Sequence, residues 1–180
     1  MKRLAIAALA RAAAAHRREA TVRQAIEDNA RANYSAQAQT HAAVIAGLAL
    51  LILGFAAYVR LAPTDPAAWH VALTPATPAS AECASSVVPG KGSATAACRL
   101  PGPPVTVLEK LDAIAMATPR TQRLAGSPQD GRITWITRSK LWGFPDYTTA
   151  QAQEIDGQTR IDLFGRLRFG SEDMGVNAAR

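Results

Sequence analysis

The pattern of apolar and polar positions separates one long apolar stretch from the rest of the chain. From residue 42 to residue 59 the sequence reads AAVIAGLALLILGFAAYV, without a charged residue. As a helix this stretch is about 27 Å long at 1.5 Å per residue, close to the ~30 Å hydrocarbon core of a bilayer. A buried helix of a soluble domain seldom lacks polar residues over such a length. We therefore predict a single transmembrane helix over residues 41–61.

Residues 1–40 form a basic, alanine-rich segment without Pro or Gly, which predicts a helix. The segment has seven Lys and Arg residues against three Asp and Glu residues. Two interpretations are open: attachment to anionic lipids at the cytoplasmic leaflet, or a solvated extension. A cleaved signal peptide is disfavoured, because Arg11 interrupts the first apolar run early and a full span follows.

Flanking charge predicts the orientation of the span. Basic residues are frequent before it, whereas after it only Arg60 stands close and the next is Lys91. The positive-inside rule then places the N-terminus in the cytoplasm and the residues after the span on the other side. In a bacterium with two membranes, this is an inner-membrane protein with a periplasmic C-terminal part.

Residues 62–104 contain eight of the eleven prolines, together with clusters of small residues. This composition predicts a linker, interrupted by a short strand near residues 68–73. Cys83 and Cys98 fall inside it, and in an oxidising compartment they are expected to form a structural disulfide worth about 3 kcal/mol. Metal binding is disfavoured, because only His70 stands nearby as a further ligand.

Residues 105–180 predict an α+β domain. The pattern indicates a helix followed by three strands, and Asp156-Gly157 is a strong hairpin signal. After the N-terminal and transmembrane helices, we expect a small, mainly antiparallel sheet packed on one helix. The expected elements are a helix over 105–117, a basic loop over 120–128, and strands over 131–138, 147–152 and 159–169.

Clustered arginines are the main candidate site. Arg160, Arg166 and Arg168 share one face of the last strand, and Arg138, at the end of the first predicted strand of the domain, is expected to lie nearby. Guanidinium groups bind phosphate and carboxylate in bidentate geometry, so these four residues could bind an anion. The alternative is a polar sheet face on which arginines pair with nearby carboxylates. The carboxylates available for such pairing are those of Asp146, Asp162, Glu172 and Asp173.

Enzyme signatures are absent from the sequence. It contains no GxSxG, HExxH, P-loop or GxGxxG motif, and no His lies in 105–180. We predict no catalytic residue, no cofactor and no metal site. The net charge of +6 comes mainly from the first forty residues, which argues against binding of nucleic acid by the C-terminal domain. The aromatic stretch 142–147 is either a packed turn or an exposed recognition loop.

Two motifs stand out in the last part of the chain. The first comprises Ser139, Trp142, Gly143, Phe144 and Asp146, and the second comprises Arg168, Gly170, Asp173, Gly175, Val176, Asn177 and Arg180. These motifs resemble the bacterial domain of unknown function 1499 family, over about residues 60–180. The segments 60–66, 118–120 and 124–127 are similar to a single-pass, membrane-anchored proteobacterial branch of that family. The resemblance implies a membrane-anchored envelope protein and no particular reaction.

These observations favour a non-enzymatic periplasmic domain that binds an envelope component or a membrane protein. The alternative is an accessory subunit of a larger membrane complex, and a distant third is an enzyme using Arg and Asp chemistry. The expected partners are the lipid bilayer and either a membrane protein or an anionic envelope component.

Overall fold

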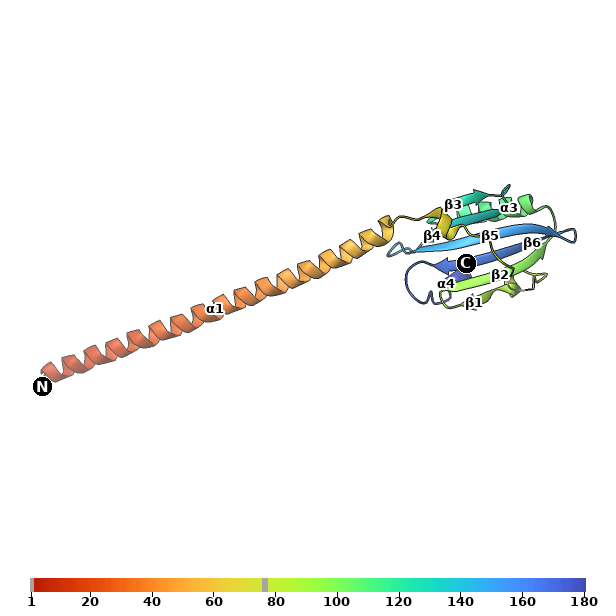
Figure 1. The fold of residues 1–180 in the computed structure, drawn as a ribbon. Coiled ribbons are helices and arrows are strands. Elements are labelled where there is room, and N and C mark those ends of the chain that lie inside the picture. Colours follow the sequence, from red (N-terminus) through yellow and green to blue (C-terminus); the bar gives the residue numbers. More distant parts are fainter. Residues whose placement is uncertain (1, 76–77) are drawn as a thin grey trace. The chain divides into compact units, whose positions relative to one another are not determined.

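The computed structural model of the protein describes residues 2–75 and 78–180. The chain divides into two units, Met1–Gly54 and Phe55–Arg180. Helix α1 (Lys2–Leu61) runs through the first unit, and its last turns belong to the second. The second unit holds all the strands and the other helices (Figure 1). The predicted fold class, a helix followed by a small antiparallel α+β domain, is confirmed.

Helix α1 is long and apolar enough to cross a membrane over part of Ala14–Leu61, a property shared by membrane anchors and signal sequences. Only 6% of its most apolar window is buried within the protein. The side chains of Ile45, Leu48 and Leu51 are 67%, 55% and 71% exposed. A soluble domain seldom leaves so continuous an apolar surface uncovered, so this exposure fits a helix surrounded by lipid.

The second unit is built on one six-stranded sheet with the order β1-β2-β6-β5-β4-β3, in which every neighbouring pair is antiparallel. The predicted Asp156-Gly157 turn joins β5 to β6. Its two residues have φ angles of 54° and 73°, as a tight two-residue hairpin requires. The strands are β1 (Val88–Gly90), β2 (Ser93–Leu100), β3 (Thr121–Ser127), β4 (Arg132–Arg138), β5 (Pro145–Ile155) and β6 (Gln158–Leu167).

Helix α3 (Pro104–Ala117) covers one face of the sheet and forms the core. Leu108 is fully buried against residues such as Ile133 and Ile161. Asp112 fixes the helix to the sheet, because its carboxylate accepts hydrogen bonds from Arg123 and from Trp135 Nε1. The short helix α4 (Val176–Ala179) lies beside β2 and β6.

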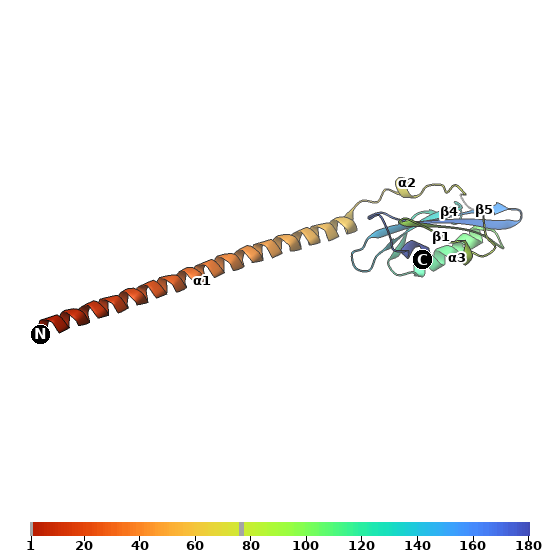
Figure 2. The same ribbon diagram turned by 90° about the horizontal axis from the view of Figure 1, so that it is seen from below.

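The predicted strand near residues 68–73 is wrong, because this segment begins as helix α2 (Pro66–Trp69) and continues without regular structure. The Asp65 side chain caps α2 by accepting a hydrogen bond from the backbone nitrogen of Ala67 at 2.9 Å. Helices α2 and α3 lie on opposite sides of the sheet (Figure 2). Residues 62–75, here called the strap, therefore cover the second face of the sheet.

Side-chain hydrogen bonds hold the strap on the sheet. Gln151 binds both the backbone nitrogen and the carbonyl of Leu73, at 3.0 and 3.1 Å. The Trp69 ring stacks on Tyr147 with 3.8 Å between ring centroids. A linker that was free to move would not bury an aromatic ring in this way. The strap is therefore part of the domain, which corrects the predicted domain boundary at residue 105.

The second half of the predicted linker also belongs to the sheet. Strand β2 pairs with β6 along its whole length, and Cys98 at its centre is completely buried. The predicted bond between Cys83 and Cys98 is present, and it ties the short helix η1 (Ala84–Ser86) and its surroundings to β2. Residues 121–127 form the edge strand β3, where the sequence predicted a basic loop.

Candidate functional site

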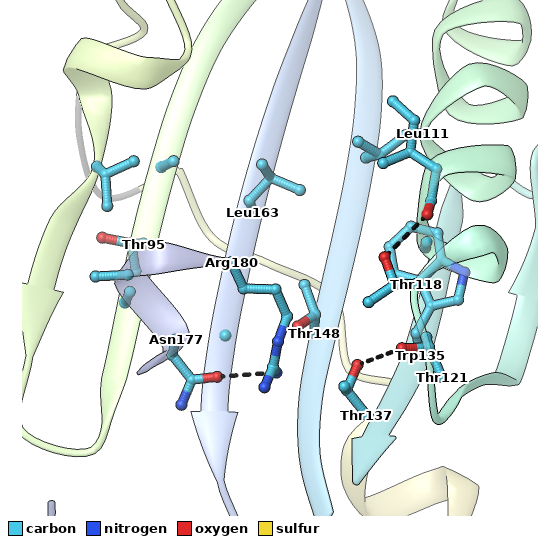
Figure 3. Close-up of a pocket in the computed structure, with 17 residues that line it drawn as sticks. Thr95, Leu111, Thr118, Thr121, Trp135, Thr137, Thr148, Leu163, Asn177 and Arg180 are labelled. Atoms are coloured by element: carbon cyan, nitrogen blue, oxygen red, sulfur yellow. Dashed lines mark hydrogen bonds between the residues drawn. The ribbon is translucent and has the colours of Figure 1, made fainter. Parts of the chain in front are cut away.

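A pocket lies between α3, α4 and the sheet, and we name it the α3–α4 pocket (Figure 3). Its volume of about 170 Å³ is comparable to that of a ~150 Å³ cavity that binds benzene. It opens to solvent beside Ile114, which is 66% exposed. The lining residues are Val87, Ala94, Thr95, Ala96, Leu111, Ile114, Ala115, Thr118, Thr121, Trp135, Thr137, Thr148, Leu163, Gly165, Asn177, Ala178 and Arg180.

Small side chains create the space in this pocket. Ala94 and Ala96 of β2 face the same side as Gly165 and Leu163 of β6, with which they are paired in the sheet. Larger residues at these positions would fill the volume between the sheet and α3. The remaining apolar wall is formed by side chains of α3, including Leu111 (Figure 3). The pocket therefore suits an apolar group.

One end of the pocket is polar. The hydroxyl groups of Thr121 and Thr137 are hydrogen-bonded to each other at 2.9 Å, and the Thr118 hydroxyl donates to the carbonyl of Ile114 at 3.0 Å. Figure 3 shows Asn177 and Arg180 on the other side of this end. Their side chains are joined by a 3.4 Å hydrogen bond from the Arg180 guanidinium to Asn177 Oδ1. The pocket thus pairs an apolar body with a polar end.

Asn177 is the unusual residue of the pocket. It is only 8% exposed, and its side-chain nitrogen Nδ2 is buried without a hydrogen-bond acceptor from the described residues. A buried donor without a partner costs about 1–3 kcal/mol. An oxygen atom of a ligand would recover that free energy, so Asn177 is a candidate ligand contact.

Asp146 connects Arg180 to the sheet. The guanidinium group of Arg180 donates to Asp146 Oδ2 at 3.0 Å. Burial raises the pKa of Asp146; the hydrogen bond and charge of Arg180 oppose this rise, and the charge of Asp173 adds to it. Arg180 therefore compensates a carboxylate that burial would otherwise destabilise, and this pairing holds its side chain at the pocket.

The second motif of the sequence builds the turn that carries α4. Asp173 accepts hydrogen bonds from the backbone nitrogens of Asn177 and Gly175, at 2.8 and 3.0 Å. The hydrogen bond from the Asn177 backbone, followed by the one from Gly175, lowers the pKa of Asp173. Gly170 and Gly175 have φ angles of 99° and 80°, which favour glycine. This motif therefore places Asn177 and Arg180 at the pocket.

The first motif orders the loop between β4 and β5. Ser139 and Phe144 exchange two hydrogen bonds, from the Ser139 nitrogen to the Phe144 carbonyl and from the Phe144 nitrogen to the Ser139 hydroxyl. Gly143 closes the turn with a φ angle of 76°. Phe144 is half-buried, whereas Trp142 is 37% exposed. The aromatic stretch therefore combines the two interpretations of the sequence, a packed turn with an exposed ring.

The four predicted anion-binding arginines lie on the strap side of the sheet, and each contacts protein groups there. Arg160 forms an ion pair with Asp162 at 2.7 Å. Arg166 donates to the Trp69 carbonyl at 2.6 Å and lies over the Trp69 ring. Arg168 donates to the Pro63 carbonyl at 2.9 Å, and Arg138 to the Gly143 carbonyl at 3.0 Å.

The strap therefore covers the face on which Arg166 and Arg168 were expected to meet a ligand, whereas Arg138 lines a surface hollow beside Arg60. Burial lowers the pKa of Arg166, whose Nε is buried without an acceptor from the described residues. The expected pairing with an arginine of this face occurs at Asp162, whereas Asp146 pairs with Arg180 of the C-terminal segment. The remaining two carboxylates have other contacts, because Glu172 pairs with Lys91 at 3.9 Å and Asp173 caps the turn before α4.

Sequence reasoning missed most of the pocket. Thr118, Thr121, Thr137 and Thr148 come from separate elements, and no motif connects them. The available signal was the run of small residues at the start of β2, which the surrounding prolines made typical of a linker. Within residues 2–75 and 78–180, no group of three His, Cys, Asp or Glu side chains is arranged to hold a metal ion.

The second unit is a small α+β domain with a six-stranded antiparallel sheet, one long covering helix and a largely apolar pocket beneath it. Residues 70–180 match the model of the family described as "Protein of unknown function (DUF1499)", and the chain belongs to this family. Residues 3–49 are similar to a second family, described as "Protein of unknown function, DUF484". Comparison with curated proteins and with solved structures found no match.

Proposed function

We propose that this protein is anchored in the inner membrane by a single pass of α1 and binds an apolar envelope component in the α3–α4 pocket, without catalysis. The distribution of Lys and Arg around the span supports a cytoplasmic N-terminus and a periplasmic second unit. The disulfide supports an oxidising compartment for the second unit.

The observation that carries the proposal is the combination of an apolar pocket with the buried, unpartnered Nδ2 of Asn177. A ligand with a short apolar portion and an acceptor oxygen satisfies both features. Arg180 and the threonine hydroxyls stand at the same end of the pocket and suit a carboxylate or ester group. The acyl portion of an envelope amphiphile has this chemistry.

The test uses the full chain in lipid nanodiscs and a photoactivatable medium-chain fatty acid. Labelled peptides identified by mass spectrometry are expected from α3 and the α4 region. Ala115→Phe fills the pocket and is expected to reduce this labelling at least tenfold. Ala113→Phe is the matched control, because Ala113 is an exposed residue of the same helix that does not line the pocket. Equal labelling of the two variants contradicts ligand binding in the pocket.

Purification of the full chain from its membranes separates this proposal from the role of accessory subunit. A stoichiometric membrane-protein partner that stays bound to Ala115→Phe would favour the accessory subunit. Retention of a lipid that is lost in Ala115→Phe would favour the binding domain.

A further inference from the structure

Helix α1 enters the second unit beside the β4–β5 loop, and this junction has a defined structure. Phe55 contacts Phe144 with 6.1 Å between ring centroids, and Tyr58 contacts Phe169 at 5.9 Å. The Arg60 guanidinium donates to the carbonyl of Leu141 at 2.8 Å. These contacts place the loop alongside the last turns of α1.

These contacts also set the depth of the loop relative to the predicted span. The uncharged run ends at Val59, and Phe55 lies about 6 Å before that point along the helix axis at 1.5 Å per residue. Phe144 packs on Phe55 and therefore reaches the level of the last turn of the span. This level is the membrane interface, where aromatic residues are enriched.

The part of the loop that faces away from the protein is apolar. Leu141 is 74% exposed and Trp142 is 37% exposed, although both belong to a loop that is otherwise hydrogen-bonded and packed. Tyr58 on the adjacent turn of α1 is 59% exposed. An exposed leucine next to an exposed tryptophan is unfavourable in water, whereas it suits the boundary between headgroups and acyl chains.

Basic residues surround a surface hollow next to this apolar tip. Arg60, Arg120, Arg138 and Lys140 line it together with uncharged residues, and no Asp or Glu is among the lining residues. Across residues 2–75 and 78–180, none of these four forms an ion pair, whereas Arg160 pairs with Asp162 and Arg180 pairs with Asp146. The hollow therefore concentrates positive charge without a carboxylate to balance it.

We propose that this basic hollow binds the phosphate groups of phospholipids in the membrane that anchors α1, while Leu141 and Trp142 insert between the lipids. We call residues 139–144, the loop between β4 and β5, the interfacial loop. Guanidinium groups suit phosphate oxygens, and anionic lipids attract basic residues close to the bilayer. Its position beside the end of the span favours lipid over a soluble anion. The inference rests on the membrane anchoring proposed above and is independent of the α3–α4 pocket.

The first experiment measures the depth of Trp142 by fluorescence quenching. The full chain is reconstituted in nanodiscs with phospholipids brominated near the interface. The wild-type protein is expected to be quenched, and Trp142→Phe is expected to remove the quenched component. The remaining tryptophans serve as internal references, because Trp135 is 2% exposed and Trp69 is stacked on Tyr147. Equal quenching of the two proteins overturns the insertion of the loop.

The second experiment tests the charge of the hollow. Arg120→Gln with Lys140→Gln is expected to reduce Trp142 quenching at least twofold in nanodiscs that contain phosphatidylglycerol. The matched control is Arg99→Gln with Lys110→Gln, which removes the same charge from residues that do not line the hollow and leaves the quenching unchanged. Equal effects of the two double variants would overturn phosphate binding by the hollow.

Incorporation of the protein into nanodiscs distinguishes failure of membrane anchoring by α1 from failure of the interfacial loop. A protein that α1 does not anchor would stay outside the nanodiscs and overturn both proposals. A protein that is incorporated but whose Trp142 is not quenched would overturn the interfacial loop alone. Added inorganic phosphate that abolishes the quenching would show an anion site that is not specific to lipid, and would overturn the lipid assignment.

Discussion

At the scale of residues, His70 of the strap is the first member of a chain of hydrogen bonds between the strap and the sheet. Its Nε2 accepts from Arg132 at 3.3 Å, so its Nδ1 is the donor to the Thr134 hydroxyl at 2.9 Å. Thr134 is hydrogen-bonded to Thr149 at 3.0 Å, and Thr149 donates to the Trp69 carbonyl at 3.5 Å. This direction of donation requires a neutral imidazole at His70.

We therefore predict that the strap is less stable in mild acid. Burial, and secondly the charge of Arg132, lower the pKa of His70, and Asp130 opposes them. The unfolded chain then binds a proton more readily than the folded one, and the free energy of unfolding falls as the pH drops below about 6.5 towards the lower folded pKa. The measurement is the thermal midpoint between pH 8 and 5. His70→Gln is expected to flatten this profile, and an unchanged slope would refute the role of His70.

Gly165 and Asn177 are expected to be energetically coupled. A Cβ atom at position 165 would lie 3.2 Å from Asn177 Oδ1 and 3.3 Å from Asn177 Cβ. Gly165→Ala should therefore displace Asn177 and destabilise the domain by about 1–3 kcal/mol. In the Asn177→Ala background the Oδ1 contact is gone. Gly165→Ala should then lower the free energy of unfolding by at least about 0.5 kcal/mol less than it does in the wild type. Denaturant unfolding of the four proteins measures this coupling, and additive effects would contradict it.

At the scale of elements, the principal difference between expectation and structure is the role of residues 62–104. Proline and small residues typically indicate a linker, yet here they form a strap and an inner strand. Strand β2 lies between β1 and β6 because its backbone groups pair with β6, a contact between residues about 65 positions apart. Local composition does not report such pairing.

The disulfide is expected to stabilise this arrangement of elements. It closes a loop with a sequence separation of 15, for which the chain-entropy model gives about 3 kcal/mol. Reduction, or Cys83→Ala with Cys98→Ala, should lower the free energy of unfolding by roughly this amount. Oxidised and reduced wild-type protein are compared by denaturant unfolding, with the double variant as the control that no longer responds to reductant. Equal stability of the two wild-type forms would contradict a structural role.

At the scale of the whole molecule, the two units are suited to different surroundings. The first is a helix with exposed apolar side chains, and the second buries its apolar residues around a sheet. The exposed apolar side chains of the first unit suit lipid, and the buried core of the second unit suits water. Loss of α1 from the chain is therefore expected to release the second unit from the membrane.

The predicted topology is tested with alkaline phosphatase, which is active only in the periplasm. Fusion after Arg180 is expected to give an active enzyme, and fusion after Thr40, before the span, an inactive one. The full-length fusion should remain in the membrane pellet after a carbonate wash. A soluble active product would indicate cleavage of α1 as a signal sequence, and an inactive fusion at Arg180 would reverse the orientation.

The sequence by itself determined those features that depend on neighbouring residues. The uncharged run defines the candidate membrane helix, periodicity defines α3, and alternation with the Asp156-Gly157 turn defines the β5–β6 hairpin. Both family motifs were also readable, because each consists of residues close together in the chain. Their role as turns that position Asn177, Arg180 and the β4–β5 loop required the structure.

Only the tertiary structure decided how distant segments meet. It placed the strap over the predicted arginine face, so that the guanidinium groups of Arg166 and Arg168 bind backbone carbonyls in place of an external anion. It also assembled the α3–α4 pocket from seven elements and the basic hollow from three separate segments. The physical reason is that hydrogen bonding and burial between distant segments depend on the final packing, which local patterns of polarity do not encode.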